Sequence, residues 1–218
     1  MRRISFLVLA AVGLAGCVSQ EPMPQVIYDY PASAPVKTLP PPIASRPAPA
    51  PSMPLPSGGV PRYWLPSRPD RAWSAIIIHH SATREGNAAI IDKWHREKNG
   101  WDGIGYDFVI GNGTNSSDGE IEPTYRWRGQ LTGAHAGGTP GNWANEEGIG
   151  ICLIGDFNYS IPTPKQRASL VQLIRFLQQR YHIPKNRIYG HGNTPGGHVT
   201  DCPGDRFPMA WLKSALPN

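Results

Sequence analysis

The chain has 218 residues, 24 of them proline and three cysteine, with a formal net charge of +5. Fifteen prolines fall between Pro22 and Pro69, and a stretch so rich in Pro, Ala and Ser cannot bury enough apolar surface to offset its chain entropy. Residues 71–218 carry 15 basic and 13 acidic side chains, so this part is nearly neutral and lacks a basic run interleaved with aromatics, which argues against nucleic acid as a partner.

The first 16 residues have the pattern of a signal peptide. Two arginines precede an apolar run at residues 4–12, which is too short to span a bilayer. Residues 14–17, LAGC, resemble the lipobox of bacterial lipoproteins, so Cys17 is the expected lipidation site; the alternative is an ordinary signal peptide with an incidental cysteine. By the same resemblance, Val18 after the cysteine favours the periplasmic face of the outer membrane.

Residues 17–70 are expected to form a disordered, Pro-rich linker behind the lipidated cysteine. As a polyproline-like chain at ~3.1 Å per residue, residues 18–60 could extend on the order of 130 Å. Residues 71–218 are then enough for one globular domain.

The first half of this domain begins with a buried strand. Residues 75–80, AIIIHH, are a β-branched run that ends in polar residues. A helix is expected over residues 87–98, where apolar side chains share one face. Strands are then predicted over residues 106–110, 120–122, 125–127 and 149–154.

The clearest helix of the second half opens at Thr163. Thr163 is a favourable N-cap, Pro164 suits the first helical position, and Gln166 completes a capping box. A strand over residues 187–190 and a terminal helix over residues 206–215 follow. The irregular alternation predicts an α/β fold with a central mixed β-sheet flanked by helices.

Two parts of the sequence could together supply three metal ligands. Hydrolysis of an amide near neutral pH needs an activated water and a stabiliser for the oxyanion, and a zinc ion with one open position supplies both. His191 follows a predicted strand, Cys202 comes after a Gly/Pro-rich loop, and the pair His79-His80 ends the first strand. On spacing alone the evidence is weak, because such residues are more often ordinary surface or core residues.

A family resemblance strengthens this interpretation. Five segments, in this order, resemble the zinc-dependent N-acetylmuramoyl-L-alanine amidase family that phage lysozyme-type amidases share with peptidoglycan recognition proteins. The resemblance covers residues 75–207. The segments are IIHHSAT at 77–83, GWDGIGYDF at 100–108, GAH at 133–135, GIGICLIGDF at 148–157 and GHGNTPGGHVTDCPG at 190–204.

The resemblance implies a peptidoglycan hydrolase that cleaves the amide between N-acetylmuramic acid and L-alanine. Its Zn²⁺ ligands would be His79, His191 and Cys202, with Tyr106 and Thr200 as catalytic residues. The expected partners are peptidoglycan and its muropeptides, with the membrane reached through the lipid on Cys17, and a monomer is expected. The sequence departs from some branches of the superfamily, which carry a general-base glutamate where Cys152 stands.

Other residues have weaker claims. His135, Trp101 and Trp143 are candidates to line the substrate site, with packing as the alternative for each. Cys152 is expected to be a small buried apolar residue rather than half of a disulfide with Cys202. His95 is expected to be structural, and His198 to be an exposed loop residue.

Three other functions stay open on the sequence. The domain could bind peptidoglycan without cleaving it, or could be a zinc peptidase that acts within the stem peptide. A thiol protease built on Cys202 and His191 is disfavoured, because no Asn or Asp stands out to orient the histidine.

Overall fold

The computed structural model describes residues 60–217. The expected signal peptide, Cys17 and the linker up to residue 59 lie outside the described residues. Between residues 60 and 217, no helix is both long and apolar enough to cross a membrane.

A five-stranded mixed sheet forms the centre of the domain, in the order β3-β2-β4-β1-β5. Strand β1 pairs in parallel with β4 and β5, β2 pairs in parallel with β4, and the edge strand β3 is antiparallel to β2. This arrangement confirms the predicted fold class. The strands are β1 (Ala75–His80), β2 (Phe108–Ile110), β3 (Ile121–Pro123), β4 (Gly148–Leu153) and β5 (Ile188–Gly190).

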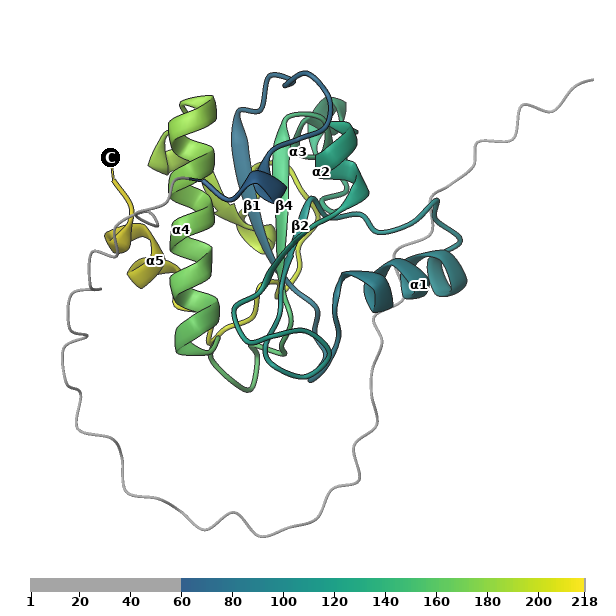
Figure 1. Cartoon of the computed structure of the whole chain (residues 1–218), viewed down its shortest axis with the longest axis vertical. Helices are drawn as coiled ribbons and strands as arrows, with labels where there is room; N and C mark the ends of the chain where they lie inside the picture. Colours follow the sequence, from purple (N-terminus) through teal and green to yellow (C-terminus); the bar gives the residue numbers. More distant parts are fainter. Residues whose placement is uncertain (1–59, 218) are drawn as a thin grey trace, which may run out of the picture. The chain divides into compact units, whose positions relative to one another are not determined.

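Helices cover both faces of the sheet (Figure 1). Helices α4 and α5 lie on one side and α1 on the other. The largest hydrophobic cluster joins α4 to Ile76 and Ile78 of β1, whereas a smaller one joins Ile91 of α1 to Val109 and Cys152. The helices are α1 (Ala88–Asn99), α2 (Tyr125–Gly129), α3 (Trp143–Glu146), α4 (Pro164–Tyr181) and α5 (Met209–Ala215).

Helix α4 forms as predicted from its cap. The Thr163 side chain accepts a hydrogen bond from the Gln166 backbone N–H, and the Gln166 side chain accepts one from the Thr163 backbone N–H. The apolar stripe of α4 then packs on the sheet, where Leu173, Ile174 and Leu177 are fully buried. Each such side chain contributes roughly 1.5–3 kcal/mol of transfer free energy, so α4 is a main source of the domain's stability.

One element predicted from the sequence is wrong. Residues 125–127 were expected to form a strand, but they begin helix α2, which is capped by the Thr124 side chain through the Arg126 backbone N–H. In a strand Tyr125 and Trp127 would share one face. In α2 they do not, because Trp127 is buried in the core while Tyr125 is exposed. The strand predicted over residues 106–110 is also shorter, since only Phe108–Ile110 pair with β3 and β4.

The packed part of the chain starts upstream of the boundary expected at residue 71. The short 3-10 helix η1 (Arg62–Trp64) buries Trp64, whose ring packs on Phe176 of α4 at a centroid distance of 5.7 Å. The Trp64 carbonyl also accepts a hydrogen bond from Nε1 of Trp127. The large apolar surface of Trp64 therefore draws residues 61–70 into the domain.

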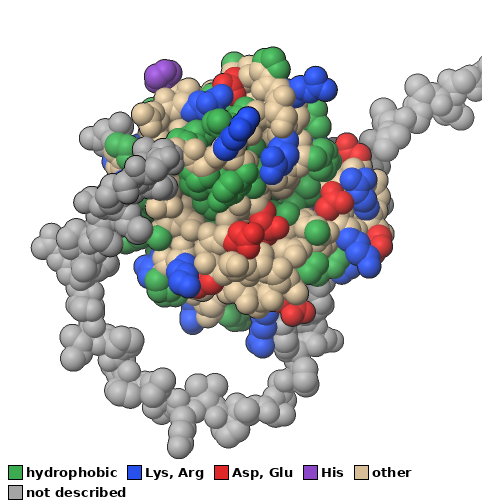
Figure 2. Space-filling model, in the orientation of Figure 1, with side chains coloured by type: hydrophobic (Ala, Val, Ile, Leu, Met, Phe, Trp, Pro, Cys, Tyr) green, Lys and Arg blue, Asp and Glu red, His purple; other side chains and the backbone are tan. Residues whose placement is uncertain are grey.

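Charged side chains of both signs occur over the face of the domain shown in Figure 2. Neither sign covers that face, which agrees with the near balance of 15 basic and 13 acidic side chains in residues 71–218.

Candidate metal centre

The sheet brings two of the three expected ligands to one edge. His79 lies at the carboxyl end of β1, and His191 directly follows β5, which is parallel to β1. Carboxyl ends of parallel strands meet at the same edge of a sheet, where binding sites commonly form. Cys202 reaches this edge from the loop between η4 (His191–Asn193) and α5.

The three side chains share one small space. One potential ligand atom from each of His79, His191 and Cys202 lies within 4.8 Å of the other two. Nδ1 of His79 is 3.6 Å from Sγ of Cys202, and the rings of His79 and His191 are 4.5 Å apart. The structure thus brings together all three residues that the sequence singled out.

The donor set of this cluster fits a transition metal such as zinc. Two imidazole nitrogens and one thiolate sulfur are ligands that zinc accepts, and a three-residue set leaves one position open. Nε2 of His191 is also buried without a hydrogen-bond partner among the described residues. An unpaired polar atom is costly in a protein interior, and its presence in the cluster supports a bound ion.

His79 and His80 point to opposite faces of the sheet, as the alternation of a strand requires. His79 shares its face with Ile77 and reaches Cys202. The ring of His80 turns to the other face, where Nδ1 accepts a hydrogen bond from the Phe157 backbone N–H. The His80 backbone N–H donates to Sγ of Cys202 at 3.4 Å, so His80 supports the cluster through its backbone.

Burial keeps the cluster uncharged in the protein without metal. Burial, followed by the neighbouring imidazoles, lowers the pKa of His79 well below its ordinary value. Burial also lowers the pKa of His191 to about 4, and it raises the pKa of the Cys202 thiol to about 12. Neutral imidazoles are ready to bind a metal, whereas the thiol must first lose its proton.

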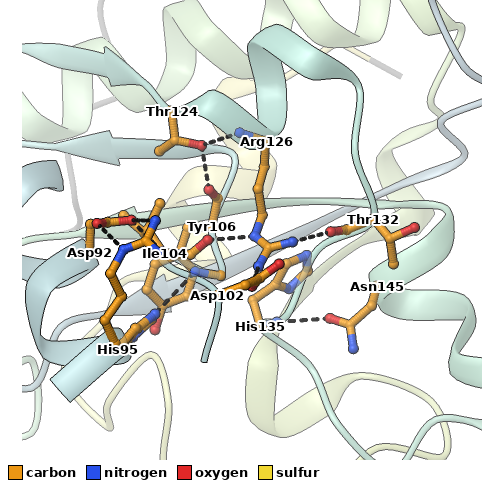
Figure 3. Close-up of polar contacts among 12 residues, drawn as sticks. Asp92, His95, Asp102, Ile104, Tyr106, Thr124, Arg126, Thr132, His135 and Asn145 are labelled. Atoms are coloured by element: carbon orange, nitrogen blue, oxygen red, sulfur yellow. Dashed lines mark hydrogen bonds and ion pairs between the residues drawn. The ribbon is translucent and has the colours of Figure 1, made fainter. Parts of the chain in front are cut away.

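Tyr106 lies beside the cluster, with its ring 5.0 Å from that of His79. Burial raises the pKa of its hydroxyl well above the ordinary value. The backbone around Tyr106 is held from both sides, because the Tyr106 carbonyl accepts a hydrogen bond from the Thr124 hydroxyl and the Gly105 N–H donates to Nδ1 of His95 (Figure 3). These contacts fix the position of the tyrosine relative to His79.

Arg126 ties together the segments around Tyr106. Its buried guanidinium donates to the carbonyls of Ile104 and Thr132, the latter at 2.6 Å, and to the carboxylate of Asp102 at 2.6 Å (Figure 3). Asp92 of α1 accepts the Ile104 N–H at 2.8 Å. The sequence did not point to Arg126, because its partners are mostly backbone atoms that no motif encodes.

Thr200 lies at a cavity beside Cys202. Its Oγ1 accepts a hydrogen bond from the Cys202 backbone N–H at 3.2 Å. The cavity measures about 350 Å³ and opens next to the candidate ligand. Its walls are formed by Gly192, Asn193, Thr200, Asp201, Cys202, Pro203, Gly204, Asp205, Phe207 and Met209.

His135 lies behind His79 rather than at this cavity. It is 7% exposed, and its Nδ1 is 3.1 Å from Nε2 of His79. Asn145 of α3 holds the backbone of His135, because its side-chain oxygen accepts the His135 N–H at 2.8 Å. The sequence named His135 but not Asn145, which lies ten positions away in an unpredicted helix.

The two candidate tryptophans take part in packing. Trp101 packs edge-on against His95 at 4.8 Å, and His95 in turn lies 5.6 Å from Tyr106. Trp143 donates from Nε1 to the Pro195 carbonyl and contacts the ring of Tyr189. Neither tryptophan lines the cavity beside Cys202.

Cys152 and His198 are where the sequence predicted them. Cys152 is fully buried in the sheet opposite His79, and both Cys152 and Cys202 are free thiols. His198 is exposed in the loop before Thr200, and its ring lies against Gly137 and Gly138. His95 is half-buried and accepts a hydrogen bond from the Gly105 N–H, as a structural residue would.

Comparison with known proteins gives a consistent result. The family described as N-acetylmuramoyl-L-alanine amidase matches residues 69–205. Peptidoglycan-recognition protein SC1a of Drosophila melanogaster is 32% identical over 140 residues, which are 60% of this chain and 68% of that protein. Among solved structures, N-acetylmuramoyl-L-alanine amidase LysC from Clostridium intestinale URNW has a TM-score of 0.55 and 30% identity, over 71% of this chain and 93% of that one.

A second similar solved structure contains a bound ligand. It is the ectodomain complex of peptidoglycan recognition proteins LCa and LCx with tracheal cytotoxin bound. The likeness has a TM-score of 0.50 and 26% identity, and it covers 69% of this chain and 87% of the other.

Proposed function

Because this chain belongs to the N-acetylmuramoyl-L-alanine amidase family, as the match over residues 69–205 establishes, we propose that it is a zinc-dependent hydrolase of peptidoglycan. The bond cleaved is the amide between the lactyl group of N-acetylmuramic acid and L-alanine. The observation that carries this proposal is the convergence of His79, His191 and Cys202, with ligand atoms within 4.8 Å of one another.

Zinc would be held by the three side chains of this cluster. When bound, the ion supplies a Lewis acid and an activated water. The protein contributes a rigid frame for it, because two of the ligands are fixed by neighbouring parallel strands and the third by the His80 backbone N–H. The complete ligand set argues against a domain that only binds peptidoglycan.

Tyr106 and Thr200 would act on the substrate. The Tyr106 hydroxyl is protonated at neutral pH like any ordinary tyrosine, and burial raises its pKa further. It can therefore donate a hydrogen bond to the carbonyl oxygen as negative charge develops there. The Thr200 oxygen accepts from the Cys202 N–H, which leaves the Thr200 proton free for the substrate. In the net reaction, water adds its oxygen to the lactyl carbonyl carbon and a proton to the amide nitrogen as the C–N bond breaks. The stem peptide therefore leaves with a free amino group on L-alanine.

The substrate would lie across the ligand cluster and the cavity of about 350 Å³ beside Cys202. Peptidoglycan and its soluble muropeptides are the proposed partners. Support comes from a similar solved structure, in which tracheal cytotoxin is bound to the complex of peptidoglycan recognition proteins LCa and LCx.

Product analysis tests this proposal. Purified peptidoglycan is digested with the wild-type chain and with His191→Ala, and the products are identified by mass spectrometry. We expect free stem peptides with L-alanine at the amino terminus from the wild type alone. Fragments cut within the stem would indicate a peptidase. If the wild type bound peptidoglycan without releasing any product, the hydrolase proposal would be wrong. It would also be wrong if both chains digested peptidoglycan equally.

We also propose that the chain is exported and lipidated at Cys17, with the residues between Cys17 and η1 as the linker from a membrane to the enzyme. The LAGC sequence at residues 14–17 supports this, as does Val18 for the periplasmic face of the outer membrane. Cells that express the wild type or Cys17→Ala are given a labelled fatty acid. Label should be found in the wild type only, and label retained by the variant would refute lipidation.

A further inference from the structure

The backbone that carries His135 is fixed by a buried asparagine. The side-chain oxygen of Asn145 accepts hydrogen bonds from the N–H groups of both His135 and Ala136, at 2.8 and 2.9 Å. The Asn145 side-chain nitrogen donates to the Ala136 carbonyl, and its backbone carbonyl accepts the Gly133 N–H. Figure 3 shows Asn145 facing the backbone of His135. The segment around His135 is therefore held at four points by one residue.

The ring of His135 lies against β4, beside Gly150. A Cβ atom on Gly150 would come within 2.5 Å of the ring, and one on Gly133 would also come within 2.5 Å. Two glycines thus make room for the imidazole in one orientation. Close packing of this kind leaves the ring no alternative position without a shift of the surrounding backbone.

Hydrogen-bond directions then determine which nitrogens carry protons. Nε2 of His135 is 3.2 Å from the Gly148 carbonyl, which can only accept, so this nitrogen must carry a proton. Nδ1 of a neutral His135 is then an acceptor.

The acceptor faces the ligand histidine. Nε2 of His79 lies 3.1 Å from Nδ1 of His135, so Nε2 of His79 must be the donor. A neutral His79 with a proton on Nε2 has its lone pair on Nδ1. This is the nitrogen that faces Sγ of Cys202 at 3.6 Å.

We infer that His135 is a positioning residue that selects the tautomer of His79, so that Nδ1 of His79 is offered to the metal before the metal arrives. The inference rests on the proposed zinc site. Partners behind a metal ligand typically change metal affinity by 10–100-fold when removed. His135 would thus act on zinc binding without touching the ion.

The tautomer can be measured directly. Long-range ¹H–¹⁵N correlation spectra of the ¹⁵N-histidine-labelled chain, without and with zinc, report which nitrogen of each ring carries a proton. We expect His79 to carry its proton on Nε2 in both states and zinc to shift its Nδ1 resonance. A proton on Nδ1 of His79 in the metal-free chain would overturn the inference. If zinc shifted no resonance of His79 or His191, the zinc site would fail while the tautomer result would stand.

Substitutions test the effect on affinity. His135→Phe keeps a ring but removes the acceptor, and we expect zinc affinity, measured by competition with a chelator, to fall about 10–100-fold. His135→Asn puts an amide oxygen near the place of Nδ1 and should recover most of the loss. His95→Phe is the matched control, since it removes a half-buried imidazole that accepts a hydrogen bond from a backbone group but does not bond a ligand.

The pattern among these variants decides between positioning and a general structural role. Thermal unfolding of the metal-free variants serves as the second measurement. A variant that loses packing has a lower unfolding temperature, whether or not the substituted residue affects zinc binding. Zinc affinity should fall in His135→Phe alone. Unchanged affinity in His135→Phe, or an equal fall in His95→Phe, would overturn the inference.

Discussion

Nδ1 of His79 lies 3.6 Å from Sγ of Cys202, although 123 positions separate the two residues in the chain. The contact joins the first strand of the sheet to a loop close to the carboxyl terminus. It depends on β5 pairing beside β1, which delivers the His191–Cys202 segment to the end of the first strand. The candidate metal centre therefore depends on how the strands of the sheet pair rather than on one local motif.

Removal of zinc should inactivate the protein reversibly. A chelator is expected to abolish digestion of peptidoglycan, and added Zn²⁺ should restore it, because the proposed activated water depends on the ion. The measurement is turbidity of a cell-wall suspension before and after chelation. Full activity in excess chelator would instead favour a thiol protease built on Cys202 and His191.

Cys202→Ser should weaken zinc binding while the fold is kept. Serine nearly preserves the volume of the side chain but replaces a soft thiolate with a poor zinc ligand. We expect a large loss of zinc affinity and of activity, with little change in the circular dichroism of the metal-free chain. Cys152→Ser is the control, since Cys152 is buried and outside the ligand cluster. Equal zinc binding by wild type and Cys202→Ser would be incompatible with the proposed ligand set.

Tyr106→Phe should separate catalysis from metal binding. Loss of one donor to a developing oxyanion typically costs ~10²–10³ in rate, and we expect kcat to fall by that order while zinc affinity stays the same. Steady-state kinetics on a soluble muropeptide, together with zinc competition, provides the two readouts. If kcat were unchanged, the hydroxyl would have no part in the reaction.

Arg126→Ala should destabilise the domain more than Asp102→Asn. The first change leaves the buried carbonyl of Ile104 and the half-buried carbonyl of Thr132 without their donor, at ~1–3 kcal/mol for a buried group left unsatisfied. Asp102, with 79% of its side chain exposed, should contribute less than about 1 kcal/mol. Denaturant unfolding measures both. Similar losses in the two variants would mean that the ion pair, and not the backbone contacts, makes Arg126 important.

Asp107 should make stability depend on pH. Burial raises the pKa of this carboxyl to about 7, and its Oδ2 accepts the Gly150 N–H. As pH rises from about 4 to about 7, the unfolded chain ionises Asp107 before the folded one does, so the contribution of Asp107 to the free energy of unfolding falls. This loss is at most ~1.4 kcal/mol per pH unit.

Asp107→Asn removes that contribution and keeps an oxygen that can accept the Gly150 N–H. We expect the free energy of unfolding of the variant to fall less than that of the wild type between pH 4 and pH 7, by urea unfolding at several pH values. Parallel curves for the two chains would show that Asp107 titrates alike in the folded and unfolded states.

The elements that were predicted correctly are those with the strongest local sequence patterns. Strand β1 is a run of β-branched residues and was predicted at its bounds, and α4 opens with a complete capping box and begins where it was predicted. Helix α2 was mistaken for a strand because three alternating side chains can fit either element when only five residues are involved. Trp64 was missed because its burial depends on α4 and Trp127, which are more than 60 residues away.

The candidate site was predictable in part. Its three potential ligands and Tyr106 stand in recognisable segments, and the structure brings them together. The residues behind them were not predictable, because the contacts of His135 with His79 and of Arg126 with Ile104 span 56 and 22 positions and depend on the register of the sheet.

The central claim is one metal centre made by His79, His191 and Cys202, and X-ray absorption at the zinc edge tests it most directly. For the purified chain loaded with one equivalent of zinc, we predict a first shell with one sulfur at about 2.3 Å and imidazole nitrogens at about 2.0–2.1 Å. The sulfur should vanish from the spectrum of Cys202→Ser. A wild-type spectrum without sulfur, or one that Cys202→Ser leaves unchanged, would contradict the account.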